Sequence, residues 1–332
     1  MVSRSVLEHT GQFDQWGDYI PQSETHDTNN TVKDSTVKDS TVKDSRVQTC
    51  WLNQFSALKI SGPDAERFLQ GQLTCNMTDM TTSTLIYGAC CTAKGRIVAN
   101  FNISFDGDSY WLILPSNSAN VLEKYLVFFK ASIENCEQSH LILGQWNTAE
   151  AGTAIHNQDQ HQLTASDHRS FMIVSDNSPQ EYQLCPTLEW RQADIQDGIY
   201  YVDGDQTEQW IPQHINWHIL GGISFSKGCY TGQEIIARLQ YLGKAKKALY
   251  YYQGVMSSHL TPEQQSAKQL FNENGKAVAD ILMLRSHNKP ENTLNLLVVT
   301  HGENPLKTLY LAESVDFPLT LQNLPYTVEK DV

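Results

Sequence analysis

The chain has 332 residues, of which 40% are hydrophobic and 18% are charged, and its formal net charge is −13 at pH 7. The length predicts two or three globular domains with an ordinary soluble composition. The acidic balance argues against strong direct nucleic-acid binding, because phosphates are bound by clustered Lys and Arg.

The first twenty residues hold no apolar stretch typical of a secretory signal. The longest apolar runs, such as residues 294–300, are far shorter than a membrane span. We therefore expect a cytoplasmic protein without membrane association. The cysteines are odd in number, lack a CxxC pair and should be free thiols in a reducing compartment, so no metal site is expected. They are Cys50, Cys75, Cys90, Cys91, Cys136, Cys185 and Cys229.

The N-terminal part of the chain contains a short repeat. Residues 31–45 read TVKDS three times, with one apolar residue in each unit. Such a segment cannot bury enough surface to offset an ordering cost of about 1–2 kcal/mol per residue. We expect residues 1–46 to form a disordered polar tail.

The next part, residues 47–245, is predicted to be an α+β body with two subdomains. Apolar runs between turn residues indicate strands, and apolar positions three and four apart indicate helices. The expected elements are a strand at 54–61, a helix at 62–73, three meandering strands in 87–115, a helix at 118–133, a strand at 168–176 and a helix at 188–203 that ends near Gly198.

From residue 246 onward the pattern becomes that of evenly spaced strands. Runs at 247–255, 276–284, 293–300 and 306–315 are separated by turn residues. This spacing is typical of a small barrel or sandwich, so residues 246–328 are predicted to form a β-barrel-like domain.

One short motif stands out at residues 227–234, which read KGCYTGQE. Thr231 and Glu234 match the T-x-x-E pattern of a capping box, and apolar residues follow at helical spacing. A helix should therefore begin near Gly232. The motif glycines and polar residues that we single out are Gly228, Gly232, Gln233 and Glu234.

Cys229 lies just before this expected helix. The free N–H groups at a helix start and the nearby charge of Lys227 would both lower the pKa of its thiol. Cys229 is thus a candidate functional thiol, with Lys227 as its companion. The alternative is an inert buried cysteine, which is the commoner fate of free Cys. No histidine base lies within the motif.

A small basic cluster follows the motif. Lys244, Lys246 and Lys247 lie close in sequence, with Arg238 one turn earlier. This cluster is either a solvated linker or a dock for an anionic tail. No phosphate-binding glycine loop and no dinucleotide fingerprint is present.

The segment WIPQHINWHILGGISFSKGCYTGQEIIAR (210–238) closely resembles the YgfZ family, folate-binding proteins tied to tRNA modification and iron–sulfur enzyme maintenance. Its K-G-C-[YF]-x-G-Q-E signature is complete. The resemblance covers about residues 50–330, and the other matching segments are 60–77, 91–100, 122–133, 194–203 and 324–330.

The resemblance implies an α+β fold like the glycine-cleavage T-protein, with two α+β domains and a C-terminal β-barrel-like domain around a central folate site. Its cofactor would be folate, as tetrahydrofolate or a derivative. The family's folate-contacting aromatic residues fall on Trp190 and on Phe55, which replaces a Trp. Tyr230 is a further candidate for binding the folate. Aromatic faces suit the flat rings of a folate.

Two departures from the T-protein pattern concern acidic residues. The residue that anchors the pterin falls on Gln196, which can form hydrogen bonds without charge, while Asp194 or Asp197 could compensate. The carboxylate that handles the transferred group has no counterpart in Val98-Ala99-Asn100. This loss argues against a folate-dependent transferase, because aliphatic side chains cannot replace a carboxylate in proton chemistry.

The resemblance therefore implies a folate-binding accessory protein that supports iron–sulfur protein assembly or repair and thereby tRNA methylthiolation. Cys229 would be the key residue. The implied partners are a reduced folate and iron–sulfur proteins such as tRNA-methylthiolating enzymes. The alternatives are a folate-dependent one-carbon transferase or demethylase, and a non-catalytic interaction scaffold.

Overall fold

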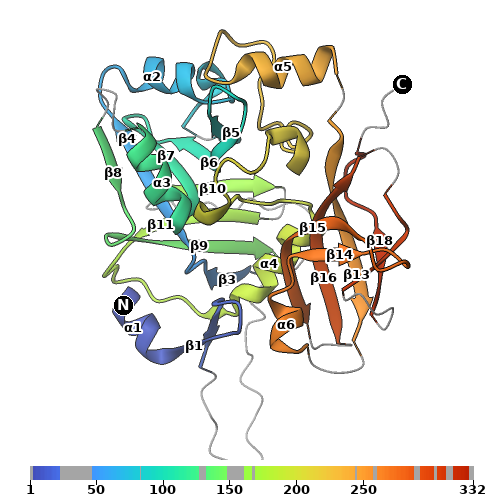
Figure 1. Cartoon of the computed structure of the whole chain (residues 1–332). Coiled ribbons are helices and arrows are strands. Elements are labelled where there is room, and N and C mark those ends of the chain that lie inside the picture. Colours follow the sequence, from blue (N-terminus) through green and yellow to red (C-terminus); the bar gives the residue numbers. More distant parts are fainter. Residues whose placement is uncertain are drawn as a thin grey trace, which may run out of the picture.

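The computed structural model contains two five-stranded sheets and a closed barrel beside them (Figure 1). The α+β class and the C-terminal barrel are confirmed. The described residues are 3–22, 47–82, 84–126, 132–147, 161–166, 169–243, 245–256, 260–287, 292–302, 305–311 and 317–328. The TVKDS repeat and Lys244 lie outside these ranges.

The first sheet contains the predicted meander. Its strands pair antiparallel in the order β5-β6-β7-β4-β8. Gly95, in the turn between β5 and β6, has φ +69°, a conformation that favours glycine. The strands are β4 (Phe55–Ser61), β5 (Leu85–Cys91), β6 (Ile97–Phe105), β7 (Ser109–Pro115) and β8 (Ser132–Asn135).

The second sheet has the order β10-β11-β9-β3-β12, and its short edge strand β12 runs parallel to β3. The predicted strand at 168–176 is β11, which lies inside this sheet between β9 and β10. The strands are β3 (Val47–Trp51), β9 (His140–Asn147), β10 (His161–Ser166), β11 (Arg169–Ser175) and β12 (Leu184–Cys185).

The helices of the body cover these sheets and carry the candidate site. Those predicted at 62–73, 118–133 and 188–203 are present in shorter form, and α2 lies beside α5 at the top of Figure 1. Three short 3-10 turns lie between them, at Met77–Asp79, Gly204–Gln206 and Pro212–Ile215. The helices are α2 (Ala65–Gln72), α3 (Ser116–Leu126), α4 (Thr187–Gln196) and α5 (Gln233–Tyr241).

The barrel closes in the order β13-β16-β15-β14-β17-β18. Its interior holds leucine, isoleucine and valine side chains such as Leu270, Leu296 and Val298, as expected from the apolar runs. The elements are β13 (Lys247–Val255), α6 (Pro262–Gln265), β14 (Gln269–Phe271), β15 (Ala277–His287), β16 (Thr293–His301), β17 (Thr308–Tyr310) and β18 (Pro318–Gln322).

The main core joins all three layers. One cluster of buried side chains takes Phe55 and Ile113 from the first sheet, Phe171 from the second and Leu297 from the barrel. Because residues of a strand alternate between its two faces, the second sheet also presents apolar side chains on its far face.

That far face is covered by the N-terminal segment, so the prediction of a disordered tail over residues 1–46 is wrong for residues 3–22. This segment forms α1 (Arg4–Thr10), β1 (Gly11–Phe13) and β2 (Tyr19–Pro21). Leu7 and Tyr19 pack in one cluster with side chains of the second sheet. The members from the sheet are Trp51, Leu141, Leu143, Met172 and Val174. A sheet with this second apolar face needs such a cover.

Candidate functional site

A cavity of about 550 Å³ lies where the N-terminal segment, the body and the barrel meet. Its walls carry charges of both signs beside tyrosine rings and short apolar side chains. Residues far apart in sequence line it, among them Trp16, Asn117, Arg191, Tyr201, Asp203 and Arg285.

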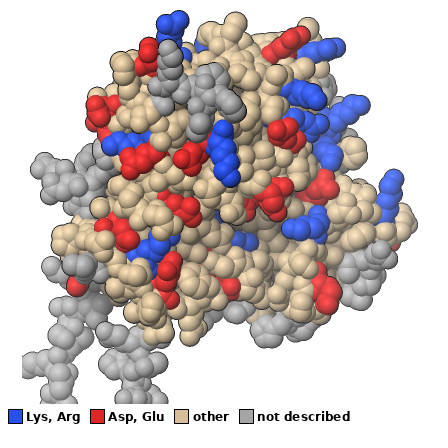
Figure 2. All heavy atoms as spheres, turned by 60° about the vertical axis from the view of Figure 1, so that its left-hand side comes forward, with Lys and Arg blue, Asp and Glu red and all other residues tan. Residues whose placement is uncertain are grey.

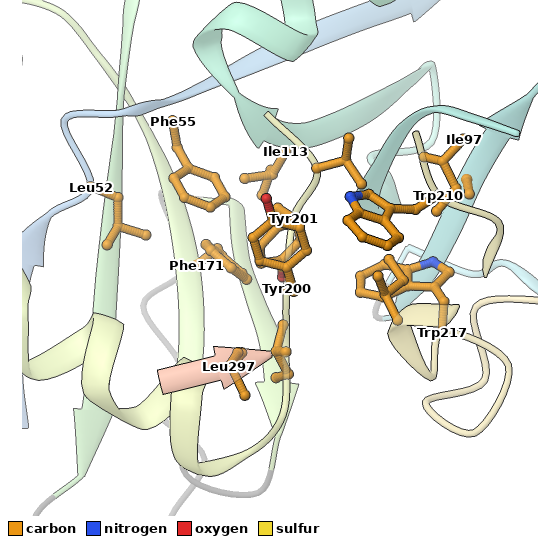
Figure 3. Close-up of a cluster of buried hydrophobic side chains, with 14 of the residues drawn as sticks. Leu52, Phe55, Ile97, Ile113, Phe171, Tyr200, Tyr201, Trp210, Trp217 and Leu297 are labelled. Carbon is orange, nitrogen blue, oxygen red and sulfur yellow. The ribbon is translucent and has the colours of Figure 1, made fainter. Parts of the chain in front are cut away.

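Phe55 and Trp190 belong to one buried aromatic cluster, and neither of them lines this cavity. Phe171 joins them, with ring-centroid distances of 6.4 Å to Phe55 and 5.0 Å to Trp190. Phe55 also meets the cavity residue Tyr201 edge to face at 5.2 Å, and these rings point toward one another in Figure 3. Both predicted aromatics are buried, with 2% and 1% of their surfaces exposed.

An ion-pair network, in which Arg169 and Asp194 are buried and the side chain of Asp197 is 42% exposed, borders the same cluster. The guanidinium of Arg169 lies 2.6 Å from Asp194 and 2.5 Å from Asp197, and 4.8 Å above the Trp190 ring. Burial raises the pKa of Asp194, and the charge of Arg169 opposes that rise. Both aspartates that were considered as substitutes for the pterin anchor are thus engaged with Arg169. Gln196, at the end of α4, is exposed.

A second charged cluster links the cavity to the N-terminal segment. The Asp18 carboxylate is fully buried, with Nε of Arg191 at 3.3 Å and Nε of Arg285 at 2.7 Å. Gln54 donates to Asp18 at 3.2 Å and to the carbonyl of Trp16 at 2.8 Å. This cluster holds the tip of the N-terminal hairpin against the cavity.

The loop that contains Cys229 is fixed by its neighbours. Nζ of Lys227 donates to the carbonyls of Leu73 and Cys75, each at 2.7 Å. Burial lowers the pKa of this amine to about 8. The ammonium also lies 5.2 Å from the centre of the buried Tyr230 ring. Lys227 therefore attaches the loop to the end of α2.

The start of α5 differs from the prediction. Its N-cap is Gly232 with φ +86° and no side-chain cap, so the expected capping box is absent. The hydroxyl of Thr231 instead faces Gln72 of α2 at 3.3 Å. Gln233 is half-buried and Glu234 exposed in the first helical turn, and Gly228 has open space around it.

Cys229 is exposed at this loop. All seven cysteines are described as free: five are buried, Cys185 is half-buried and Cys229 is exposed. The motif thus presents a thiol to solvent, while its neighbours Lys227 and Tyr230 lie in the interior. None of the described residues that line the cavity comes from this loop.

Within residues 98–100, which hold no carboxylate, Asn100 has a structural role. Asn100 is fully buried, donates to the carbonyl of Tyr200 at 2.8 Å and accepts from the N–H of Val202 at 2.7 Å. Its amide therefore connects β6 to the segment that forms one cavity wall. Both ends of the side chain are occupied.

The basic cluster after the motif is partly neutralised. Lys247 pairs with Asp280 at 2.8 Å and lies 5.5 Å from the centre of the Trp210 ring. Acidic and basic side chains are mixed over the face of the molecule drawn in Figure 2. In the part of the chain that the structure describes, no helix is long and apolar enough to cross a membrane, and no three metal-binding side chains gather.

Comparison with known proteins shows which proteins this chain is similar to. The tRNA-modifying protein YgfZ of Colwellia psychrerythraea is 29% identical over 302 residues, covering 83% of this chain and 92% of the relative. The YgfZ proteins of Klebsiella pneumoniae and Escherichia coli are 29% and 26% identical over 306 residues, each covering 84% of this chain and 92% and 93% of the relative. No family model matches the chain.

The resemblance to the YgfZ family is confirmed. The fold agrees with it, because glycine cleavage system aminomethyltransferase T from Bartonella henselae superposes with a TM-score of 0.64. That match covers 86% of this chain and 87% of the transferase at 10% sequence identity, so it concerns the fold alone.

The structure arranges the candidate residues differently from the sequence expectation. It brings Phe55 and Trp190 together, while Cys229 and Gln196 lie elsewhere on the surface. Sequence reasoning missed Trp16, Asp18 and Arg285. A usable signal was the aromatic and acidic content of residues 13–19, which is unusual for a disordered tail.

Proposed function

We propose that this protein is a folate-binding accessory factor that supports iron–sulfur proteins and, through them, the methylthiolation of tRNA. The proposal assigns two roles to two places. The cavity binds a reduced folate, and the exposed thiol of Cys229 acts on, or is bound by, a partner. The name of its relatives, tRNA-modifying protein YgfZ, supports the tRNA part.

The cavity walls fit a folate. Its volume of about 550 Å³ falls in the usual range for small-molecule sites. Asp203 and Asp205 can accept hydrogen bonds from the amino groups of a pterin, and Arg191 and Arg285 can bind the glutamate carboxylates. The indole N–H of Trp16 is buried without a hydrogen-bond partner among the described residues, so a bound acceptor would satisfy it.

The exposure of Cys229 is the observation that carries the functional assignment. A thiol must be accessible to exchange sulfur or bind iron with a second protein, and this one is accessible at the end of a loop whose backbone is held in place. The buried cysteines cannot serve without local unfolding. Lys227 and Tyr230, which are buried close to Cys229 in the same motif, hold the loop in place.

The structure of β6 disfavours a one-carbon transferase. Such a reaction needs a group that can stabilise an iminium or move a proton. Asn100 cannot ionise, and its amide is already used by Tyr200 and Val202. Binding of the folate without its turnover is the function that these residues support.

Complementation tests the assignment of Cys229. A bacterium that lacks its own YgfZ would receive the wild-type chain, Cys229→Ala or the control Cys185→Ala, and methylthio-modified tRNA nucleosides would be measured by mass spectrometry. We expect wild type and Cys185→Ala to restore the modification and soluble Cys229→Ala to restore less than a tenth of it. Equal restoration by all three would remove Cys229 from the mechanism.

Calorimetric titration tests the folate assignment on the purified protein. We expect 5-formyltetrahydrofolate, a stable reduced folate, to bind with one site per chain. No binding by this compound or by tetrahydrofolate would refute the cofactor part of the proposal.

A further inference from the structure

The two arginines that contact Asp18 have more hydrogen-bond donors than their contacts within the protein use. Arg285 donates hydrogen bonds from Nε to the Asp18 carboxylate and from Nη1 to the carbonyl of Leu284 at 2.9 Å. Arg191 donates from Nε to Asp18 and from Nη2 to the side-chain oxygen of Gln54. Nη2 of Arg285 and Nη1 of Arg191 have no hydrogen-bond partner among the described residues. Both arginines line the cavity, whereas Asp18 does not.

The two guanidinium groups therefore lie between a buried carboxylate and the cavity. The side chains of Arg191 and Arg285 are 6% and 11% exposed, so little water screens them. Among the described residues, Asp18 is the one acidic side chain in ion-pair contact with both guanidinium groups. The acidic side chains of Glu137, Asp203 and Asp205 also line the cavity. Trp16, whose ring lies 5.4 Å from the Arg285 guanidinium, adds a free N–H at the same wall.

We propose that Arg191 and Arg285 form a carboxylate-binding subsite of the cavity, and that Asp18 of the N-terminal segment is a built-in competing carboxylate that sets its affinity. The ligand class is a small molecule that carries a carboxylate on an elongated body. Only the identification of that body as a folate rests on the function proposed above.

The N-terminal segment thereby becomes a determinant of specificity. Trp16 and Asp18 lie before the region that carries the family resemblance, in a hairpin tip. The carboxylate of Asp14 fixes this tip by accepting from the N–H groups of residues 16 and 18 at 2.8 and 2.9 Å. A rigid tip keeps the Asp18 charge at a constant distance from any bound anion, so its repulsion is a fixed cost for carboxylate ligands.

Removal of the Asp18 charge should strengthen anion binding. The probes are 5-formyltetrahydrofolate, p-aminobenzoylglutamate, which has the carboxylates without the pterin, and a tetrahydropterin without carboxylates. With Asp18→Asn we expect roughly tenfold tighter binding of both carboxylate probes, with a steeper salt dependence, and a change of less than about twofold for the tetrahydropterin. The matched control Asp280→Asn changes the net charge equally, in a barrel ion pair that does not line the cavity, and should leave the binding of all three probes unchanged.

A second variant covers the case in which Asp18→Asn does not fold. Arg285→Gln keeps Asp18 paired with Arg191 and should weaken both carboxylate probes roughly tenfold while the tetrahydropterin binds as before. Unchanged carboxylate binding in this variant, or unchanged or weaker binding in folded Asp18→Asn, would overturn the subsite.

The two proposals fail separately. If no variant binds 5-formyltetrahydrofolate but Asp18→Asn gains affinity for p-aminobenzoylglutamate, the folate assignment fails and the subsite stands. If the wild type binds 5-formyltetrahydrofolate and Asp18→Asn binds it no better, the subsite fails and the folate assignment stands.

Discussion

The cavity walls and the Cys229 loop are built in opposite ways. The cavity takes its polar side chains from positions as distant as 16 and 285, and buried ion pairs hold them together. The loop takes its candidate residues from eight consecutive positions, and hydrogen bonds to the backbone hold it, as those of Lys227 show. The first region depends on the whole fold, whereas the second depends on a short segment and its immediate supports.

The cavity region should respond most strongly to loss of a charge. Arg169→Met leaves Asp194 buried without its partner, so we expect a loss of about 3–5 kcal/mol in the free energy of unfolding. Urea denaturation measures this loss. Lys247→Met is the control, because its pair with Asp280 has side chains 40% and 34% exposed and should contribute less than about 1 kcal/mol. Equal effects of the two variants would show that burial does not distinguish the pairs.

The loop should respond to backbone geometry instead. Gly232 has φ +86°, and a Cβ there would lie 2.5 Å from the carbonyl oxygen of Thr92. Gly232→Ala should therefore cost about 1–3 kcal/mol and displace the start of α5. Gly228→Ala is the internal control, since a Cβ there meets nothing within 4 Å. Urea denaturation of both variants checks this, and a smaller loss for Gly232→Ala than for Gly228→Ala would contradict it.

The same contrast explains what could be predicted from the sequence. The meander, the helices at 62–73 and 188–203 and the barrel follow from local periodicity and turn residues, and each is present. The KGCYTGQE motif is recognisable because its residues are contiguous. Phe55 and Trp190 were predicted from the family resemblance. Their shared contact with Phe171 could not be predicted without the three-dimensional structure.

The failures have physical causes that no local pattern contains. The N-terminal segment folds because the second sheet has apolar side chains on its far face, such as Trp51 and Leu143, which exist as a surface only after the sheet forms. Asp18 pairs with Arg285, which lies 267 positions later in the sequence. The predicted capping box is absent because the helix begins after Gly232, which adopts a left-handed conformation, and the Thr231 hydroxyl faces α2 instead.

Acid should weaken the structure around His214, which lies in the 3-10 turn Pro212–Ile215. Burial, together with the charges of Lys247 and Arg96, lowers the pKa of His214 to about 4. Because the unfolded chain binds this proton near pH 6.5, stability is complete above that pH and falls as the pH drops toward 4. Comparing wild type with His214→Gln should show a loss specific to wild type of about 1–2 kcal/mol between pH 6.5 and 4, since His214 is partly exposed.

Urea denaturation at several pH values makes that measurement. The control is His301→Gln, at an exposed position on the barrel, which should follow wild type across the range. If His214→Gln also follows wild type, His214 is not the group responsible for the acid sensitivity.

The smallest effect on stability is expected where the effect on function is largest. Cys229 is exposed, so Cys229→Ala should change the free energy of unfolding by less than about 0.5 kcal/mol. Cys90→Ala, at a fully buried position, should cost about 1–3 kcal/mol. A thiol reagent should label one cysteine rapidly in the folded wild type and none in folded Cys229→Ala. Rapid labelling that survives in Cys229→Ala would assign the accessible thiol to another cysteine, and the two regions would then no longer divide binding and thiol chemistry between them.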